Sequence, residues 1–298
     1  MIPASVLVIN KPSGITSHMV ISKLRYLLQD RKMGHCGTLD PMASGILPIM
    51  LGTAVKASEY LVDHDKRYYA GITLGIKTDT QDSTGSVLYR HEGPLPSFEA
   101  LKEAAKAFTG KIMQTPPMYS ALKVDGVKLL ELAREGVTVE REPREVNIYS
   151  CECINKDGAY FLDVECSRGT YIRTLCADIG EALGYGAVMS SLVRTAVGGF
   201  TLDDALEFDS LNGMTREEIL ARAIPVERMF KHLPYAQLQP FYDRLYGNGE
   251  KIALKKLRGV RGETGQLFRV YNEERGFYSL GEIVEHNGTQ CFKLKKLF

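Results

Sequence analysis

Residues 34–48 read GHCGTLDPMASGILP, and this stretch sets one acidic residue, Asp40, among glycines and prolines. Glycine permits backbone angles that other residues avoid, while Pro41 and Pro48 each fix φ and stiffen the path. The density of both residue types predicts an ordered loop over residues 33–48 rather than a helix or a strand. Such a loop would present Asp40 in a defined place. An Asp before a proline is also a common turn starter, so a simple capping role stays open.

The residues before this loop predict a strand, a turn and a helix. Residues 6–9 form a short apolar run that stops at Lys11-Pro12-Ser13-Gly14. Thr16 or Ser17 then suits a helix N-cap, and apolar residues recur at helical spacing as far as about Gln29.

The residues after the loop mix strands and helices. Tyr68–Leu74 has the composition of a strand, and Tyr160–Cys166 alternates as a strand does. Phe98–Phe108 has apolar residues at helical spacing after Ser97, a suitable cap. Because no regular β-α-β repeat connects these elements, the sequence predicts an α+β fold.

The C-terminal part of the chain has a different composition pattern. From about Leu238, short β-like runs at residues 268–271, 276–281 and 291–294 are separated by Gly, Asn and charged residues. The 298 residues suffice for one large domain and a small one. We therefore expect a small, closed β domain at this end.

Overall composition is that of a folded soluble protein, with 44% hydrophobic and 24% charged residues. The N-terminus lacks the basic and apolar regions of a signal peptide, and no apolar run approaches the roughly 20 residues of a membrane span. The six cysteines include no C-x-x-C pair, so we expect reduced, mostly packed thiols. These features predict a cytoplasmic protein.

The charge is unevenly spread although its net value is only +1. Residues 1–70 contain eight Lys or Arg and five Asp or Glu, and residues 241–298 contain eleven and seven. Two basic ends would suit a polyanion such as nucleic acid, because phosphate neutralisation supplies most sequence-independent affinity. Ordinary solvated surface charge gives similar imbalances.

A second informative stretch joins Asp65-Lys66-Arg67-Tyr68-Tyr69 to a polar turn that ends at Gly85. Tyrosines can stack on an extruded base, and neighbouring basic side chains can meet phosphate. Strand aromatics more often pack in a core. Asp79 and Asp82 in the turn suggest either a magnesium site or two capping groups.

The third stretch, residues 166–175, leads from a strand into a helix-like segment that carries Tyr171 and Arg173. If residues 171–173 are extended, alternation places both side chains on one face. An Arg beside a catalytic Asp would hold it ionised and oriented, whereas a structural ion pair is the alternative.

Together and in this order, the stretches resemble the TruB family of tRNA pseudouridine synthases, over most of residues 5–200. The resemblance implies an α+β pseudouridine synthase fold, with a large mixed, mainly antiparallel sheet flanked by helices and loops. It implies a catalytic domain at residues 1–236 with an RNA-gripping thumb insertion at about 116–144, and a PUA-like RNA-binding domain at 237–298. For most of the charged residues of the thumb, a place on an ordinary solvated helix is an alternative interpretation. The matching segments are 11–17, 34–48, 66–68, 74–85, 116–126 and 169–173.

The resemblance also implies the activity: isomerisation of the uridine at position 55, in the T-loop of tRNA, to pseudouridine. Asp40 would be the nucleophile, Tyr68 would stack on the base and help to remove the C5 proton, and Arg173 would pair with Asp40. Substrate or RNA binding is implied for His35, Tyr171, Lys11, Lys56 and Leu192. No cofactor or metal is implied, and the partner is the tRNA T-arm with its loop, bound by a monomer without a membrane or an obligate protein partner. An accompanying tRNA-folding role stays open.

Three other functions are weighed against this one. A pure RNA-binding protein would not need the set of Asp40, Tyr68 and Arg173. A metal-dependent nuclease would use Asp79 and Asp82 and would depend on magnesium. A related synthase acting on ribosomal or guide-directed RNA is disfavoured because the chain lacks an extra basic tail.

Overall fold

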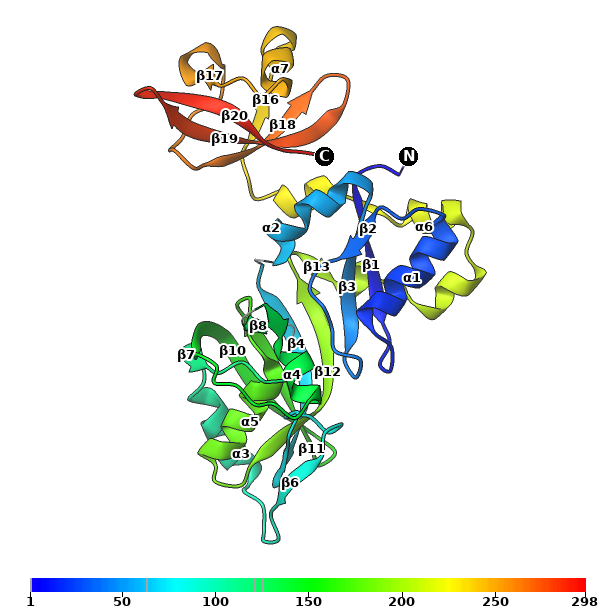
Figure 1. The fold of residues 1–298 in the computed structure, drawn as a ribbon, viewed down its shortest axis with the longest axis vertical. Helices are drawn as coiled ribbons and strands as arrows, with labels where there is room; N and C mark the ends of the chain where they lie inside the picture. The colour runs from blue at the N-terminus through cyan, green and yellow to red at the C-terminus, as the bar shows by residue number, and fades with distance from the viewer. Residues whose placement is uncertain (1, 63, 121, 125) are drawn as a thin grey trace.

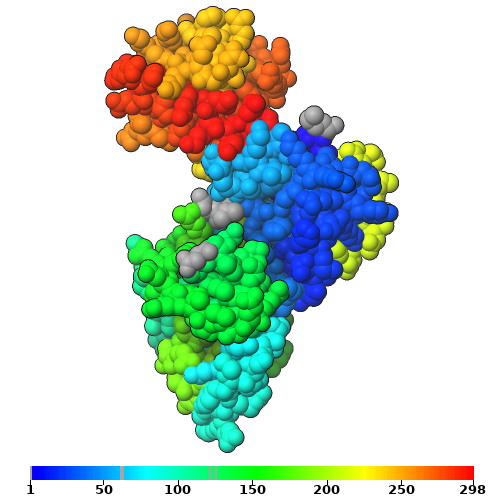
Figure 2. Space-filling view, viewed as in Figure 1, coloured from blue at the N-terminus to red at the C-terminus, as the bar shows by residue number. Residues whose placement is uncertain are grey.

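The protein has a large sheet domain and a smaller C-terminal sheet domain, as a computed structural model describes for residues 2–62, 64–120, 122–124 and 126–298 (Figure 1). The C-terminal domain forms a separate lobe at one end of an elongated molecule (Figure 2). None of the helices in these residues has the length and apolar content to cross a membrane.

The large sheet has eleven strands, eight of them in the order β14-β1-β3-β12-β4-β11-β10-β7, with β2, β13 and β15 paired at its sides. Only the pairs β1–β14 and β3–β12 are parallel, so the predicted mixed, mainly antiparallel sheet is confirmed. The strands are β1 Ser5–Lys11, β2 Met33–His35, β3 Ser44–Leu51, β4 Lys66–Leu74, β7 Gly110–Gln114, β10 Arg144–Lys156, β11 Ala159–Cys166, β12 Ala187–Val197, β13 Phe200–Thr201, β14 Leu206–Glu207 and β15 Ile224–Pro225.

Two of the helices flanking this sheet begin at the caps that the sequence predicts. The Thr16 hydroxyl accepts the Met19 N–H at the start of α1, and the Ser97 hydroxyl accepts the Ala100 N–H at the start of α3. The helices are α1 Ser17–Leu28, α2 Ser58–Val62, α3 Phe98–Lys106, α4 Leu129–Arg134, α5 Ile172–Ala182, α6 Arg216–Ala221 and α7 Pro240–Gly247. Short 3-10 turns are η1 Gly52–Ala57, η2 Leu202–Asp204, η3 Asp209–Gly213, η4 Val226–Phe230 and η5 Leu254–Lys256. Two small hairpins pair β5 Ile76–Thr78 with β6 Val87–Arg90, and β8 Lys123–Val124 with β9 Val127–Lys128.

The expectation of a loop over residues 33–48 is wrong at both ends, because β2 and β3 occupy them. Residues 45–51, Pro48 included, are all buried, so burial outweighs the turn-forming residues. Pro48 is tolerated because its carbonyl accepts the Cys36 N–H at 2.9 Å, so the side of Pro48 that lacks an N–H faces the end of β2 and not the β1 ladder. Only residues 36–43, which we call the Asp40 loop, are irregular.

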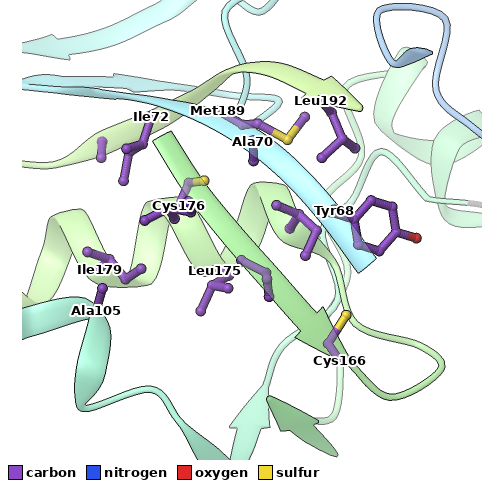
Figure 3. Packing of buried hydrophobic residues seen from close by; sticks show 14 of the residues in the cluster. Tyr68, Ala70, Ile72, Ala105, Cys166, Leu175, Cys176, Ile179, Met189 and Leu192 are labelled. Atoms are coloured by element: carbon purple, nitrogen blue, oxygen red, sulfur yellow. The ribbon is translucent and has the colours of Figure 1, made fainter. Parts of the chain in front are cut away.

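The hydrophobic core nearest the Asp40 loop lies between α5, α3 and the strands β4, β11 and β12. Ala70, Leu175 and Met189 are fully buried there (Figure 3). Tyr68 lies at the edge of this cluster and its hydroxyl points away from it (Figure 3). The predicted strand of Tyr68 therefore carries core residues and one side chain at the border of the core. Four of the six cysteines, Cys36, Cys166, Cys176 and Cys291, are buried, as packed thiols should be.

The C-terminal sheet has five strands in the order β16-β18-β19-β20-β17. All three predicted β runs lie in it, and the boundary expected at residue 237 falls inside β16. The expected small β domain is confirmed, although in the described residues its end strands β16 and β17 pair on one side only and do not pair with each other. Helix α7 covers the core instead, since the buried Tyr246 stacks on Phe292 at 5.5 Å between ring centroids. The strands are β16 Tyr235–Gln237, β17 Ile252–Ala253, β18 Leu267–Asn272, β19 Gly276–His286 and β20 Thr289–Leu297.

Candidate active site

A pocket of about 830 Å³ opens where the Asp40 loop, β4, β12 and the start of α5 meet residues from the segment 116–144. We call this segment the thumb segment. Most of the residues predicted for the site line this pocket: His35, Asp40, Tyr68, Tyr171, Arg173 and Leu192. With residues 16–18 and 80–84, which also line the pocket, seven separate parts of the chain therefore supply one concave surface.

Asp40 and Arg173 form the predicted ion pair, with 3.1 Å between Asp40 Oδ2 and Arg173 Nε. The Asp40 side chain is 40% exposed, whereas that of Arg173 is 7% exposed. Arg173 also donates to the backbone carbonyls of Tyr119 at 2.9 Å and Thr80 at 3.2 Å. A buried, fully engaged arginine thus holds a carboxylate that a ligand in the pocket can reach.

The segment around Tyr171 and Arg173 is not extended, so strand alternation is the wrong reason for their proximity. Helix α5 begins at Ile172, and Tyr171 is its N-cap residue. The buried Gln114 side chain fixes this helix start, because its Oε1 accepts the Tyr171 N–H at 2.8 Å and its Nε2 donates to the Tyr171 carbonyl at 3.1 Å. Both side chains still reach the pocket from the first turn.

Burial raises the pKa of the Asp40 carboxyl above its ordinary value. The Arg173 guanidinium opposes this rise, Asp82 adds to it and Lys11 opposes it. The prediction that the arginine favours the ionised form is right in sign, but desolvation is the larger effect. A poorly solvated carboxylate with a raised pKa suits a nucleophile or a base.

Asp82 is a second carboxylate on Arg173, with 3.6 Å between its Oδ2 and Arg173 Nη1. Its Oδ1 accepts hydrogen bonds from the Thr80 hydroxyl, the Thr84 N–H and the Thr84 hydroxyl at 2.6–2.9 Å. The capping interpretation of Asp82 is therefore confirmed, and Asp79 likewise accepts the Ser86 N–H at 2.8 Å. In the residues that the structure describes, no three His, Cys, Asp or Glu side chains gather as metal ligands.

Lys11 lies behind the Asp40 loop and not in the pocket wall. Its fully buried ammonium donates to the carbonyls of Pro12 at 2.9 Å, Ile15 at 2.7 Å and Pro41 at 3.3 Å. Burial lowers the pKa of Lys11 to about 8, although Asp40 opposes that change. Lys11 thus supports the residue next to Asp40 through the backbone.

A further anchor holds the Asp40 loop from α1. The Ser17 hydroxyl donates to the Leu39 carbonyl at 3.1 Å and accepts the Leu39 N–H at 3.0 Å. Since Leu39 itself is 3% exposed, the residue before Asp40 is held by its backbone and by its side chain.

The remaining wall of the pocket is aromatic and apolar. Tyr68 and Leu192 are each 8% exposed, and burial raises the pKa of the Tyr68 phenol. Burial, with help from Arg194 and His18, lowers the pKa of His35, so its ring is neutral near pH 7. Neutral flat groups and a leucine suit contact with the faces of a planar base.

Lys56 is not brought to the pocket. It lies in η1, and its ammonium donates to the Leu297 carbonyl at 3.1 Å, where the C-terminal lobe meets the large domain. Beside it, Lys296 pairs with Glu59, and the rings of Phe298 and Phe230 stack with 5.6 Å between centroids. Lys56 therefore connects the two domains.

Sequence reasoning missed Gln114 and Arg194. Arg194 lies in β12 and is 1% exposed. Its available signal was a single charged residue inside a strand-like run, which demands buried partners. Gln114 offered no comparable signal, because its contact with Tyr171 spans 57 residues of sequence.

Comparison with known proteins identifies the family. The model described as TruB family pseudouridylate synthase, N-terminal domain, matches residues 25–172, and the model of the tRNA pseudouridylate synthase B C-terminal domain matches residues 173–231. The tRNA pseudouridine synthase B of Alkaliphilus oremlandii is 44% identical, with 98% of both chains covered, and that of Clostridium kluyveri is 41% identical, covering 98% of this chain and 99% of its own. A chain of a Cbf5-Nop10-Gar1 complex superposes with a TM-score of 0.72 at 26% identity, over 98% of this chain and 84% of that one. The chain belongs to the TruB family of pseudouridylate synthases, enzymes that isomerise uridine to pseudouridine.

Proposed function

We propose that this enzyme isomerises the uridine at position 55, in the T-loop of tRNA, with Asp40 as the nucleophile. The observation that carries the proposal is the reachable Asp40 carboxylate, held by the buried Arg173 in a pocket that Tyr68 and Leu192 line. The names of the relatives, tRNA pseudouridine synthase B, support tRNA as the substrate.

The pocket suits a uridine that has left the RNA stack. Extruding a base costs roughly a few kcal/mol, which stacking and pocket contacts must offset. The ring of Tyr68, the neutral ring of His35 and the side chain of Leu192 supply flat and apolar contact. Tyr171 at the start of α5 adds a second phenol to the wall.

The chemistry balances without an outside reactant. The N1–C1′ bond breaks, a C5–C1′ bond forms, a proton leaves C5 and a proton is placed on N1. Asp40 forms the covalent bond that permits glycosidic cleavage, and Tyr68 assists removal of the C5 proton. Covalent catalysis by a carboxylate combined with proton transfer is sufficient for such an isomerisation.

Around this pocket we assign the RNA contacts to two parts of the chain. The thumb segment covers one side, where Arg134 joins the pocket lining. The PUA-like C-terminal domain, with eleven basic and seven acidic residues in 241–298, lies farther along the T-arm. The enzyme acts as a cytoplasmic monomer without an obligate protein partner, and sedimentation with and without tRNA tests this state.

The decisive experiment uses a T-arm stem-loop with tritium at C5 of the target uridine. Release of tritium counts turnovers, because the C5 hydrogen leaves during isomerisation. Asp40→Asn keeps the shape of the side chain and is expected to lower turnover on the order of 10⁴-fold or more while RNA affinity stays near that of the wild type. The same stem-loop with cytidine at the target is the blank. Turnover by Asp40→Asn at the wild-type rate would exclude the mechanism.

A further inference from the structure

Arg194 is the largest fully buried side chain in the described residues, with 1% of its surface exposed. No carboxylate in this part of the chain forms an ion pair with it, unlike Arg173. Removing a guanidinium from water without a counter-charge is costly, so its hydrogen bonds must have a specific use.

The hydrogen bonds of Arg194 hold the Asp40 loop from both sides. Its Nη2 donates to the Gly37 carbonyl at 2.8 Å, at the start of the loop. Its Nε donates to the Ile46 carbonyl at 2.8 Å, in the strand that follows the loop. The planar guanidinium of Arg194 therefore fixes the distance between the chain segment before Asp40 and the one after it.

The backbone of Arg194 adds a third attachment. Arg194 pairs with Gly45 in the parallel ladder of β12 and β3. Gly45 has φ +101°, and a Cβ there would lie 2.3 Å from the Arg194 carbonyl oxygen, so only glycine permits this approach. A Cβ on Gly37 would likewise lie 3.1 Å from Arg194 Nη1.

Arg194 also reaches the other side of the pocket through Tyr68. The two residues are direct partners in the antiparallel ladder of β12 and β4. The nearby charge of Arg194 opposes the rise that burial causes in the pKa of the Tyr68 phenol. The same guanidinium thus connects the Asp40 loop with the aromatic wall.

We propose that Arg194 is a positioning residue that sets the placement of the Asp40 loop relative to the Tyr68 ring, so that the carboxylate and the ring meet one base from defined directions. The inference rests on the proposed function. Arginine suits the task because its rigid fork donates in several directions at once, whereas the lysine ammonium is a compact charge on a flexible stem. Arg194→Lys therefore keeps the charge and loses the fork.

The test compares Arg194→Lys and the neutral Arg194→Met with the wild type by tritium release, RNA affinity and thermal unfolding. We expect both variants to fold and to bind the stem-loop within about threefold of the wild type. Turnover should fall on the order of 100-fold, since a displacement of about 1 Å in a reacting group has that effect.

Arg228→Lys is the matched control. Arg228 also uses its fork, donating to both Asp204 carboxylate oxygens and to the Gly199 carbonyl, but it does not line the pocket. Its replacement is expected to lower the unfolding temperature and leave turnover unchanged.

Three results would overturn the inference. Turnover of a folded Arg194→Lys within threefold of the wild type would show that the fork is dispensable. Equal losses of turnover and affinity would make Arg194 an RNA-binding determinant. If both Arg194 variants were unfolded while Arg228→Lys stayed folded, Arg194 would be a general stabiliser of the sheet. Failure of the wild type itself to release tritium would instead contradict the proposed function, and with it this role of Arg194.

Discussion

The Asp40 loop and the thumb segment line the same pocket, yet they are held in opposite ways. The Asp40 loop is short, its Leu39 and Ala43 are buried, and cations or hydroxyls bind carbonyls along its length. The thumb segment is mostly exposed. Among its described residues after Pro117, Leu129 is the only apolar one that is buried. The difference indicates that the carboxylate proposed to react is fixed in advance, while the segment proposed to contact the RNA is weakly anchored.

We therefore expect substitutions of residues that hold the Asp40 loop to lower turnover, and substitutions in the thumb segment to alter RNA affinity. Among the residues that hold the Asp40 loop, the largest effect is expected for Arg173→Met, which removes the partner of Asp40 and leaves Asp82 buried without a counter-charge. Turnover should fall roughly 10³-fold, and stability should fall by about 3–5 kcal/mol. Kinetics and urea unfolding measure the two losses.

The double variant Arg173→Met with Asp82→Asn separates these effects. Neutralising Asp82 should restore much of the stability without restoring turnover, because Asp40 still lacks its partner. Recovery of both together would mean that Arg173 acts only on stability.

The next effect concerns pH and Lys11, whose pKa is about 8. As pH rises through 8, the ammonium becomes an amine with fewer donors, so its hold on the Pro41 carbonyl weakens and turnover should decline several-fold. Lys11→Met should show low turnover that no longer changes between pH 7 and 9. Lys23 contacts the ring of Phe208 and neither residue lines the pocket, so Lys23→Met should keep the wild-type profile.

The stability of the protein should change in the opposite direction over this range. Folding lowers the pKa of Lys11 from 10.5, so the unfolded chain binds more protons between about pH 8 and 10.5. The contribution of Lys11 to the free energy of unfolding therefore rises with pH in that window. Comparing the wild type with Lys11→Met by urea unfolding isolates it, and a contribution that falls with pH would contradict the assignment.

A smaller effect is expected in the thumb segment. Arg134 is exposed and borders the pocket, so Arg134→Ala should raise KM a few-fold, leave kcat unchanged and reduce the salt dependence of RNA binding by about one unit. Arg90→Ala, an exposed arginine in β6 outside the pocket, is the control. If Arg134→Ala changed kcat alone, the thumb segment would not differ from the Asp40 loop in the way proposed.

The smallest effect is expected in the stability of Asp40→Asn. Because folding raises the pKa of Asp40, its ionised form costs stability above that pKa, and the neutral variant should unfold at the same or a slightly higher temperature at pH 7. Asp82→Asn, which disturbs a carboxylate with three donors, should unfold at a lower temperature. Scanning calorimetry compares them, and a clear loss of stability in Asp40→Asn would contradict the cost assigned to its charge.

The sequence predicts local structure correctly where the interactions that form it join residues close together in the chain. Thr16 and Ser97 cap helices through bonds that span three residues, and the strand at Tyr68–Leu74 follows from its own composition. The same local reasoning failed for residues 44–51, because glycine and proline marked a turn while burial in the middle of the sheet made a strand.

The sequence by itself predicted the α+β class and the two-part organisation, and its resemblance to the TruB family grouped Asp40, Tyr68 and Arg173 as one candidate set. Only the tertiary structure decided how Asp40 is held. Lys11, Ser17 and Arg194 bind the backbone carbonyls around it. Every residue has a backbone carbonyl, so the pattern of side chains does not indicate which carbonyls will accept hydrogen bonds. Only the folded structure shows these contacts.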